Sequence, residues 1–337
     1  MKKTATSGWR RKLLAGLTAL ATLGTVALAG PTQAQAGPRD YLRPDSNGTC
    51  EWDAVNYWVQ RCEVFSPASG RVIEVQIQPA QRGGDAGLYL LAGAAAGLDG
   101  NNNWMTTFGN APAEFVNNNV TLVAPVGGAG TFYTDWIDPT GKPTDAWGTF
   151  LTQELPDYLA RNFGVSRNNN AVAGMSMGGT AAMSLAARYP QQFKQVLSYS
   201  GYLTLGGATG NAAAAAALSQ FHRMSVTAVY NTFMAPGTPT HDPMLHIPAL
   251  RNTDVYISAA TGVPAPADQG LPLDAQIAGA SMEAASLAGT AAWDAAARLQ
   301  GLNFTAHYEP VGLHNWNNWR HELVLTHDRI LNTLNAW

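Results

Sequence analysis

The chain has 337 residues, of which 46% are hydrophobic and only 13% are charged, and its formal net charge is −3. This length and apolar content suffice for one large α/β domain, or two small ones, with a sizeable core. With so few Lys and Arg residues, we expect no basic patch for nucleic-acid phosphates and no nucleic-acid partner.

Residues 1–36 have the three parts of a secretory signal peptide: a basic start, an apolar run over 13–30, and the small-residue site Ala34-Gln35-Ala36. The apolar run ends in this cleavable site rather than in charges that would stop transfer, which favours cleavage over a lasting membrane span. Cleavage after Ala36 removes five of the 20 basic residues and none of the 23 acidic ones, so the formal net charge falls from −3 to −8. We therefore expect a secreted or cell-envelope protein with a single domain over 37–337.

The two cysteines, Cys50 and Cys62, lie close together near the expected mature N-terminus. An oxidising destination favours a disulfide between them, worth about 3 kcal/mol. The alternative is a pair of free buried thiols. Two cysteines without a nearby pair of histidines do not make a metal site.

Strand and helix patterns alternate along most of the chain. Residues 71–78, RVIEVQIQ, alternate apolar and polar side chains and predict an edge strand of a hairpin. Short apolar runs predict buried strands at 88–93, 119–125, 170–174, 193–201, 254–260 and 304–310. Helical patterns fall between them at 147–163, 177–189 and 281–300. The alternation predicts one doubly wound α/β domain with a mostly parallel sheet.

The alternation stops over 207–250, where an Ala-rich stretch is followed by a Pro-punctuated one. An Asn start and high intrinsic helix propensity favour a helical flap insertion here.

The stretch Gly174-Met175-Ser176-Met177-Gly178 spells GxSxG where a predicted strand ends and a predicted helix begins. A serine at such an elbow sits in a strained turn that lifts its hydroxyl above the sheet. The free N–H groups of the helix N-terminus point toward a developing oxyanion. We therefore predict Ser176 as a nucleophile and the amide of Met177 as one arm of an oxyanion hole.

A serine nucleophile needs a base, and this geometry usually places the residues in the chain order Ser, acid, His. His314 follows the last predicted strand by a short loop, at the edge of the sheet where α/β active sites assemble. The acid should lie just past the penultimate strand, which leaves Asp268 and Asp274; we favour Asp268. Glu283 is set aside because it lies on the following helix.

Metal and nucleotide cofactors are not expected. His241 and His246 are five residues apart, which does not put two imidazoles on one helical face. No GxGxxG or P-loop follows any predicted strand.

Several longer motifs are similar to those of one family. They are LYLLAG (88–93), APVGGAGTFYTDW (124–136), WGTFLTQELPDYL (147–159), AGMSMGG (173–179), ARYPQQFKQVLSYSG (187–201) and HNWNNW (314–319). Together they span most of the mature chain, which resembles the mycolyltransferase family of antigen 85 type.

The resemblance implies an α/β-hydrolase fold and an acyltransferase with serine-esterase chemistry. Ser176 would take a long mycolic acyl chain from a trehalose ester and pass it to another sugar hydroxyl, with His314 as the base. The family acid lies two residues beyond a proline, as Asp268 lies beyond Pro266. The second oxyanion amide maps to Ala94.

The chain departs from this family in one loop, which reads LLAGAA where family members read LLDGLR. Ala92 and Ala95 offer no side-chain hydrogen bonds to trehalose, and an unpaired sugar hydroxyl costs about 1 to 3 kcal/mol. A plain carboxylesterase acting on lipids or polyesters, and a non-catalytic cell-envelope binding protein, therefore remain alternatives. Trp316 and Trp319, beside the base, are either a platform for stacking a sugar substrate or part of the core.

Overall fold

The computed structural model describes residues 37–137, 143–205 and 241–337. The predicted signal peptide (1–36) and residues 207–240 of the predicted flap lie outside the described residues. None of the helices described is both long and apolar enough to cross a membrane.

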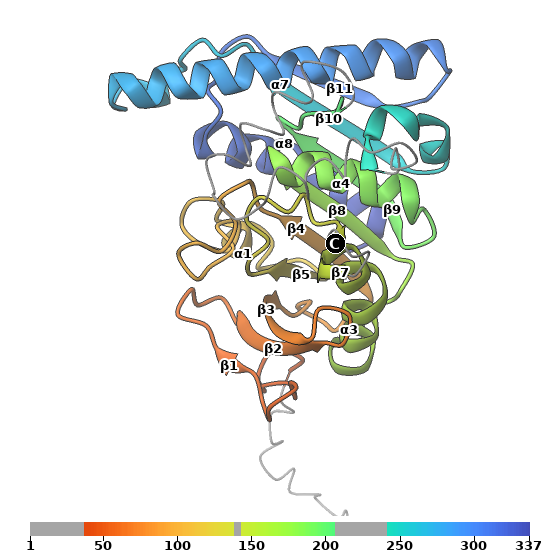
Figure 1. The fold of residues 1–337 in the computed structure, drawn as a ribbon. Helices are drawn as coiled ribbons and strands as arrows, with labels where there is room; N and C mark the ends of the chain where they lie inside the picture. Colours follow the sequence, from red (N-terminus) through yellow and green to blue (C-terminus); the bar gives the residue numbers. More distant parts are fainter. Residues whose placement is uncertain (1–36, 138–142, 206–240) are drawn as a thin grey trace, which may run out of the picture. The chain divides into compact units, whose positions relative to one another are not determined.

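A nine-stranded sheet forms the centre of the described domain (Figure 1). In spatial order its strands are β1 (Glu51–Trp52), β2 (Gln60–Ser66), β3 (Arg71–Gln78), β5 (Val120–Pro125), β4 (Ala86–Leu91), β8 (Asn170–Met175), β9 (Phe193–Tyr199), β10 (Asp254–Ala260) and β11 (Thr305–Glu309). The strands from β5 to β11 pair in parallel, while β1, β2 and β3 pair antiparallel. The predicted mostly parallel sheet is thus confirmed.

The strand at 71–78 is not at an edge of the sheet, so that prediction was wrong. β3 pairs on one side with β2 and on the other with β5. The last four residues of β3 are all buried, and the polar ones among them are hydrogen bonded within the protein: the Gln76 amide donates to Asp53 and the Gln78 amide to the Tyr57 and Pro112 carbonyls. β2 itself was not predicted. It carries Cys62, which forms the predicted disulfide with Cys50 at an S–S distance of 2.03 Å.

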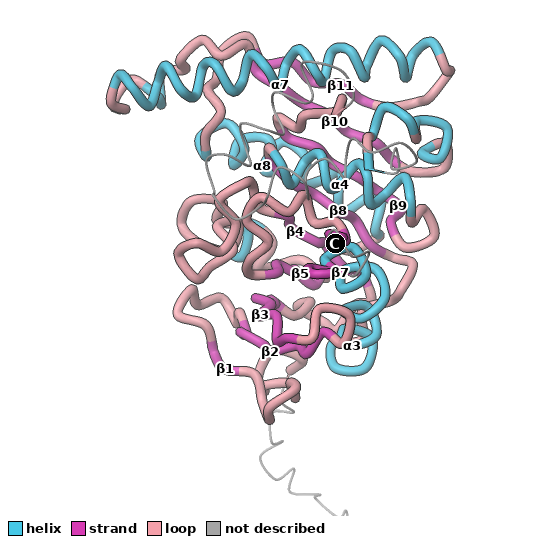
Figure 2. The backbone as a smooth tube through the Cα atoms, in the orientation of Figure 1, coloured by secondary structure: helices cyan, strands magenta, loops and turns pink. Residues whose placement is uncertain are grey.

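Helices cover both faces of the sheet (Figure 2). They are α1 (Ala111–Glu114), α2 (Trp147–Thr149), α3 (Leu155–Phe163), α4 (Met177–Arg188), α7 (Leu273–Leu299) and α8 (Trp316–Leu334). A short two-stranded sheet, β6 (Asp135–Ile137) and β7 (Pro143–Ala146), precedes α2.

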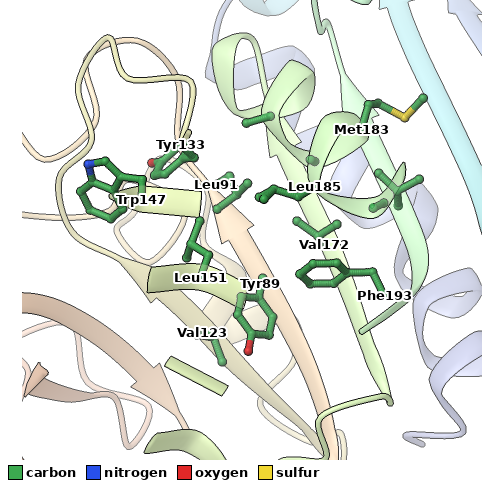
Figure 3. Close-up of a cluster of buried hydrophobic side chains, with 14 of the residues drawn as sticks. Tyr89, Leu91, Val123, Tyr133, Trp147, Leu151, Val172, Met183, Leu185 and Phe193 are labelled. Atoms are coloured by element: carbon green, nitrogen blue, oxygen red, sulfur yellow. The ribbon is translucent and has the colours of Figure 1, made fainter. Parts of the chain in front are cut away.

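The two faces can be read from β4, whose successive side chains point to opposite sides. Tyr89 and Leu91 belong to one hydrophobic cluster with Met183 and Leu185 of α4 (Figure 3). The same cluster contains buried residues of α3 and α7. Leu88 and Leu90 belong to a second cluster, together with residues of α1 and α8. The domain is therefore a three-layer α/β sandwich, with α3, α4 and α7 on one face and α1 and α8 on the other.

The predicted helix over 147–163 is present but not regular. A π-helical turn, Phe150–Glu154, joins α2 to α3. Pro156, the second residue of α3, cannot donate a backbone hydrogen bond, which accounts for the irregular geometry before it.

The last residues of the predicted flap, 241–250, are described and form two short 3₁₀ turns, Pro243–Leu245 and Ile247–Leu250. Pro243, Ile247 and Leu250 are buried, and the indole of Trp293 on α7 donates to the Pro243 carbonyl. This end of the segment is thus anchored to the body of the domain.

Candidate active site

Ser176 lies at the turn between β8 and α4, with φ 54° and ψ −124°. A non-glycine residue with positive φ is strained, and such strain persists only where the surroundings hold it. Two glycines provide the space. A Cβ on Gly174 would lie 2.2 Å from the Gly178 carbonyl oxygen, and one on Gly178 would lie 2.3 Å from the Leu91 carbonyl oxygen. The GxSxG pattern is therefore a packing requirement of this elbow.

His314 faces the serine. Its Nε2 lies 2.8 Å from Oγ of Ser176, although the two residues are 138 positions apart. The imidazole is held in place by its surroundings, because its backbone N–H donates to the Gly279 carbonyl and its ring packs edge-on against Trp319 at 5.0 Å. The structure thus brings together the two residues predicted as nucleophile and base.

The carboxylate that contacts His314 belongs to Glu283. Nδ1 of His314 lies 2.7 Å from Oε2 of Glu283, whose side chain is fully buried. The other oxygen, Oε1, accepts hydrogen bonds from the Ser200 hydroxyl at 2.8 Å and from the Ala260 amide at 2.7 Å. In the tautomer whose Nδ1–H donates to this carboxylate, Nε2 has the lone pair that accepts from the Ser176 hydroxyl.

The prediction of Asp268 as the acid is therefore corrected. Asp268 is buried, but its carboxylate binds Asn315 and Asn317 rather than His314. The competitor Asp274 is exposed in the first turn of α7. Neither residue takes the place that Glu283 occupies beside the imidazole.

The error came from confining the acid to the loop after the penultimate strand, whereas the acid lies on the helix that follows, α7, which begins at Leu273 and not at 281 as predicted. Glu283 therefore lies in the third turn of a long helix whose buried face passes under the His314 loop. Gly279, Glu283, Ser286 and Thr290 form a buried stripe along α7, but none of them has an apolar side chain, so the sequence has no hydrophobic period that marks this face of the helix. A carboxylate on a buried helix face is rare unless it is paired.

A cavity of about 260 Å³ opens beside Ser176 and His314. The segment Ala92–Gly97 forms one side of it, with Met175, Met282, Trp316 and Trp319 among the other lining residues. His314 is the only titratable side chain among the lining residues that the structure describes. The site therefore presents one acid–base group in an otherwise nearly uncharged wall.

The two predicted oxyanion amides lie near this cavity. Met177 is the first residue of α4, directly after the elbow serine. Ala94 lines the cavity, in the loop that follows β4. Gly178 packs against the carbonyls of Leu91 and Ala92, which brings the start of α4 close to the end of β4.

The aromatic residues predicted near the base also line the cavity. The Trp316 ring packs edge-on against Trp104 and Trp319, with centroids 5.2 and 5.3 Å apart. Trp319 in turn contacts the imidazole, so its ring supports His314 directly.

Among the described residues, His307, Glu309 and Glu322 form the group whose polar atoms are closest to a metal-ligand arrangement, all lying within 4.8 Å of one another. His307 Nδ1 lies 3.0 Å from Glu322, and the Tyr256 hydroxyl donates to the other oxygen of that carboxylate. Burial raises the pKa of Glu322, against the opposing effect of these hydrogen bonds. Hydrogen bonds within the protein thus satisfy the group.

A serine elbow, a buried Glu–His pair and a parallel sheet between two helical layers together define an esterase of the α/β-hydrolase class. The Esterase family model matches residues 66–330. A structure titled as an S-formylglutathione hydrolase from Agrobacterium tumefaciens shares this fold, with a TM-score of 0.60 over 82% of this chain and 95% of that chain, at 14% identity.

Closer relatives are more specific. The diacylglycerol acyltransferase/mycolyltransferase Ag85B of Mycobacterium avium is 32% identical over 97% of this chain and 95% of its own length. Ag85C of Mycobacterium leprae, named in the same way, is 32% identical over 82% of this chain and 83% of its own. The Mycobacterium tuberculosis protein MPT51 (FbpC1) superposes with a TM-score of 0.69 at 31% identity, over 82% of this chain and 98% of that chain. This chain belongs to the esterase family, in the group of the antigen 85 mycolyltransferases.

Proposed function

We propose that this protein is an exported serine acyltransferase that works through an acyl-serine intermediate. His314 takes the proton of Ser176 as the serine oxygen attacks an ester carbonyl, and Glu283 stabilises the imidazolium that forms. The alcohol of the donor leaves with that proton. A second alcohol, or water, then gives its proton to His314 and attacks the acyl-serine, which restores the free serine.

The observation that carries the proposal is the hydrogen-bonded chain Ser176–His314–Glu283, with distances of 2.8 and 2.7 Å. In this hydrogen-bonded series, the His314 tautomer that carries its proton on Nδ1 can accept the serine proton at Nε2. The amides of Met177 and Ala94 are the proposed donors to the oxyanion, because both lie beside the elbow.

The proposed reaction moves a long mycolic acyl chain between trehalose esters and sugar hydroxyls of the cell envelope. The names of the antigen 85 relatives support acyl transfer, since they are called acyltransferases and mycolyltransferases. The pattern of residues 1–36 supports export. Trp316, at the cavity wall, is the proposed surface for stacking a sugar ring.

One observation favours a second candidate, a carboxylesterase that passes the acyl group to water. The cavity wall from Ala92 to Ala96 has no side chain that could hydrogen bond a sugar acceptor. An acceptor held only by backbone and by stacking competes less well with water.

Two measurements test these functions. Intact-mass labelling with a fluorophosphonate should add one adduct to the wild type and none to Ser176→Ala. A folded wild type that takes no adduct would instead support a non-catalytic cell-envelope binding protein. Turnover of a trehalose monoester should then rise when free trehalose is added, with the diester as the product. A turnover rate that does not change with added trehalose would instead support the carboxylesterase.

A further inference from the structure

Asp268 is a buried carboxylate that the triad does not use. Only 1% of its surface is exposed, and it ends a short 3₁₀ turn, Pro266–Asp268, in the loop after β10. Its Oδ2 accepts the Ala265 amide at 2.9 Å, which closes its own turn. Burying a carboxylate is costly unless its oxygens are satisfied, so its remaining partners show what it stabilises.

Those partners bracket His314 along the chain. Oδ1 of Asp268 accepts hydrogen bonds from the side-chain amides of Asn315 at 2.7 Å and Asn317 at 3.0 Å. The backbone amide of Leu313 also donates to the carboxylate. The donors therefore include Leu313 directly before the catalytic histidine and Asn315 directly after it. Asn317 provides a further donor.

Asn315 connects this carboxylate to a helix. While its side-chain N–H donates to Asp268, its side-chain oxygen caps α8 by accepting from the amides of Asn317 and Asn318. The segment that carries His314 is thus held between the Asp268 turn and the first turn of α8. On its other side, the His314 amide donates to Gly279 of α7.

The site favours the charged form of Asp268. Burial acts to raise its pKa, but the hydrogen bonds from Asn317, Asn315 and the amides of Ala265 and Leu313 together outweigh burial, and the pKa lies below its ordinary value. All of these partners are donors. In Asp268→Asn the new side-chain NH₂ group would therefore face the N–H group of one of these partners.

We propose that Asp268 is a positioning residue, whose carboxylate fixes the 313–317 segment so that the His314 imidazole stays aligned between Ser176 and Glu283. The proposal rests on the proposed function, because it assigns Asp268 to the same catalytic histidine. Asp268 does not line the cavity and acts only through the backbone and caps around His314.

The test compares Asp268→Asn with Asp274→Asn, a matched control at an exposed carboxylate on the first turn of α7. A displaced base costs up to about 100-fold, so the rate of fluorophosphonate labelling and kcat for a p-nitrophenyl ester should fall about 10- to 100-fold in Asp268→Asn. KM should change by less than about threefold, because the cavity wall is untouched. Asn317→Ala removes one donor at an exposed position and should give a smaller loss of kcat in the same direction.

A double-mutant cycle separates positioning from general destabilisation. All rates are measured below the melting transition of each variant. If Asp268 acts through His314, the Asp268→Asn change should alter the residual labelling rate of a His314→Ala protein by less than about twofold. An equal loss in both backgrounds, or wild-type kcat in Asp268→Asn, would overturn the proposal.

A measurement that does not depend on turnover tests the positioning role even if the proposed function fails. The proton that His314 donates to Glu283 should give a low-field imidazole resonance that is absent in His314→Ala. In Asp268→Asn this resonance should shift or broaden, while in Asp274→Asn it should not. An unchanged resonance in Asp268→Asn would refute the positioning role, even if the wild type proved to have no esterase activity.

Discussion

The substitution Glu283→Gln keeps the shape of the side chain but replaces one oxygen by a donor. In the wild type, Oε1 accepts from the Ala260 amide at 2.7 Å, and a backbone N–H can only donate. The glutamine must therefore place its carbonyl oxygen against Ala260 and its NH₂ group against Nδ1 of His314. The opposite orientation would set two donors against each other in a fully buried position.

This orientation reverses the tautomer of the base. An NH₂ group that donates to Nδ1 requires Nδ1 to be unprotonated, so the imidazole proton moves to Nε2. Nε2 lies 2.8 Å from the Ser176 hydroxyl and would then be a donor, unable to take the serine proton. The imidazolium formed during attack also loses its carboxylate partner.

The expected cost follows from known triads, where the equivalent change in chymotrypsin-like proteases lowers kcat about 10⁴-fold through the wrong tautomer. At 1.36 kcal/mol for each factor of ten, this is about 5 kcal/mol of lost transition-state stabilisation. KM should change little, because Glu283 does not line the cavity. The melting temperature should also change little, since the volume and most of the hydrogen bonds are kept.

The assay is the hydrolysis of a p-nitrophenyl ester together with the rate of fluorophosphonate labelling, with folding checked by circular dichroism. Asp274→Asn is the matched control and should keep wild-type rates. A folded Glu283→Gln protein with kcat within tenfold of wild type would refute the assignment of the acid. The assignment would also be refuted if kcat fell 10⁴-fold in Asp268→Asn and changed little in Glu283→Gln.

Three further outcomes are expected. Gly178→Ala places a Cβ 2.3 Å from the Leu91 carbonyl oxygen, so it should lower the melting temperature and abolish fluorophosphonate labelling together. Replacing Cys50 and Cys62 by Ser should lower the free energy of unfolding by about 2 to 4 kcal/mol in urea denaturation, whereas a reductant should leave the melting temperature of that variant unchanged. The pKa of Asp268 is lowered in the folded state, so its contribution to stability is present above the ordinary carboxyl pKa and is lost as the pH falls through the lowered value. Asp268→Asn should therefore lose less stability in acid than the wild type, as measured by thermal melts from pH 7 down to about pH 3.

The sequence was most informative where a local pattern and a local structure coincide. GxSxG after an apolar run predicts the elbow because both glycines are required by close backbone contacts, at Gly174 and Gly178. His314 could be placed because it follows the last strand by a short loop, and parallel strands end at one edge of the sheet. The parallel order from β5 to β11 follows from the same alternation of strand and helix.

The acid could not be placed in this way, because it was expected in the loop after the penultimate strand, whereas Glu283 lies on the helix that follows that loop. Residues 273–280 include Gly279 and follow a Pro-rich loop, so their pattern gives a weak helix signal. Gly279 is nevertheless buried against Leu313 at the His314 segment, where a Cβ would lie 3.2 Å from the Leu313 side chain. Packing between α7 and this segment, which no local pattern contains, sets the register that aims Glu283 at the imidazole.

A triad acid on a helix has a mechanical consequence. α7 is anchored below Glu283 by the Ser286 and Thr290 hydroxyls, which both donate to the Gly201 carbonyl, and by the buried indole of Trp293. The carboxylate is therefore fixed by the core rather than by the loop over 261–272. That loop can change its length without moving the acid, provided that Asp268 still binds the segment that carries the base. The two carboxylates thus act differently on one imidazole, because Glu283 hydrogen bonds the ring itself while Asp268 holds the segment that carries it.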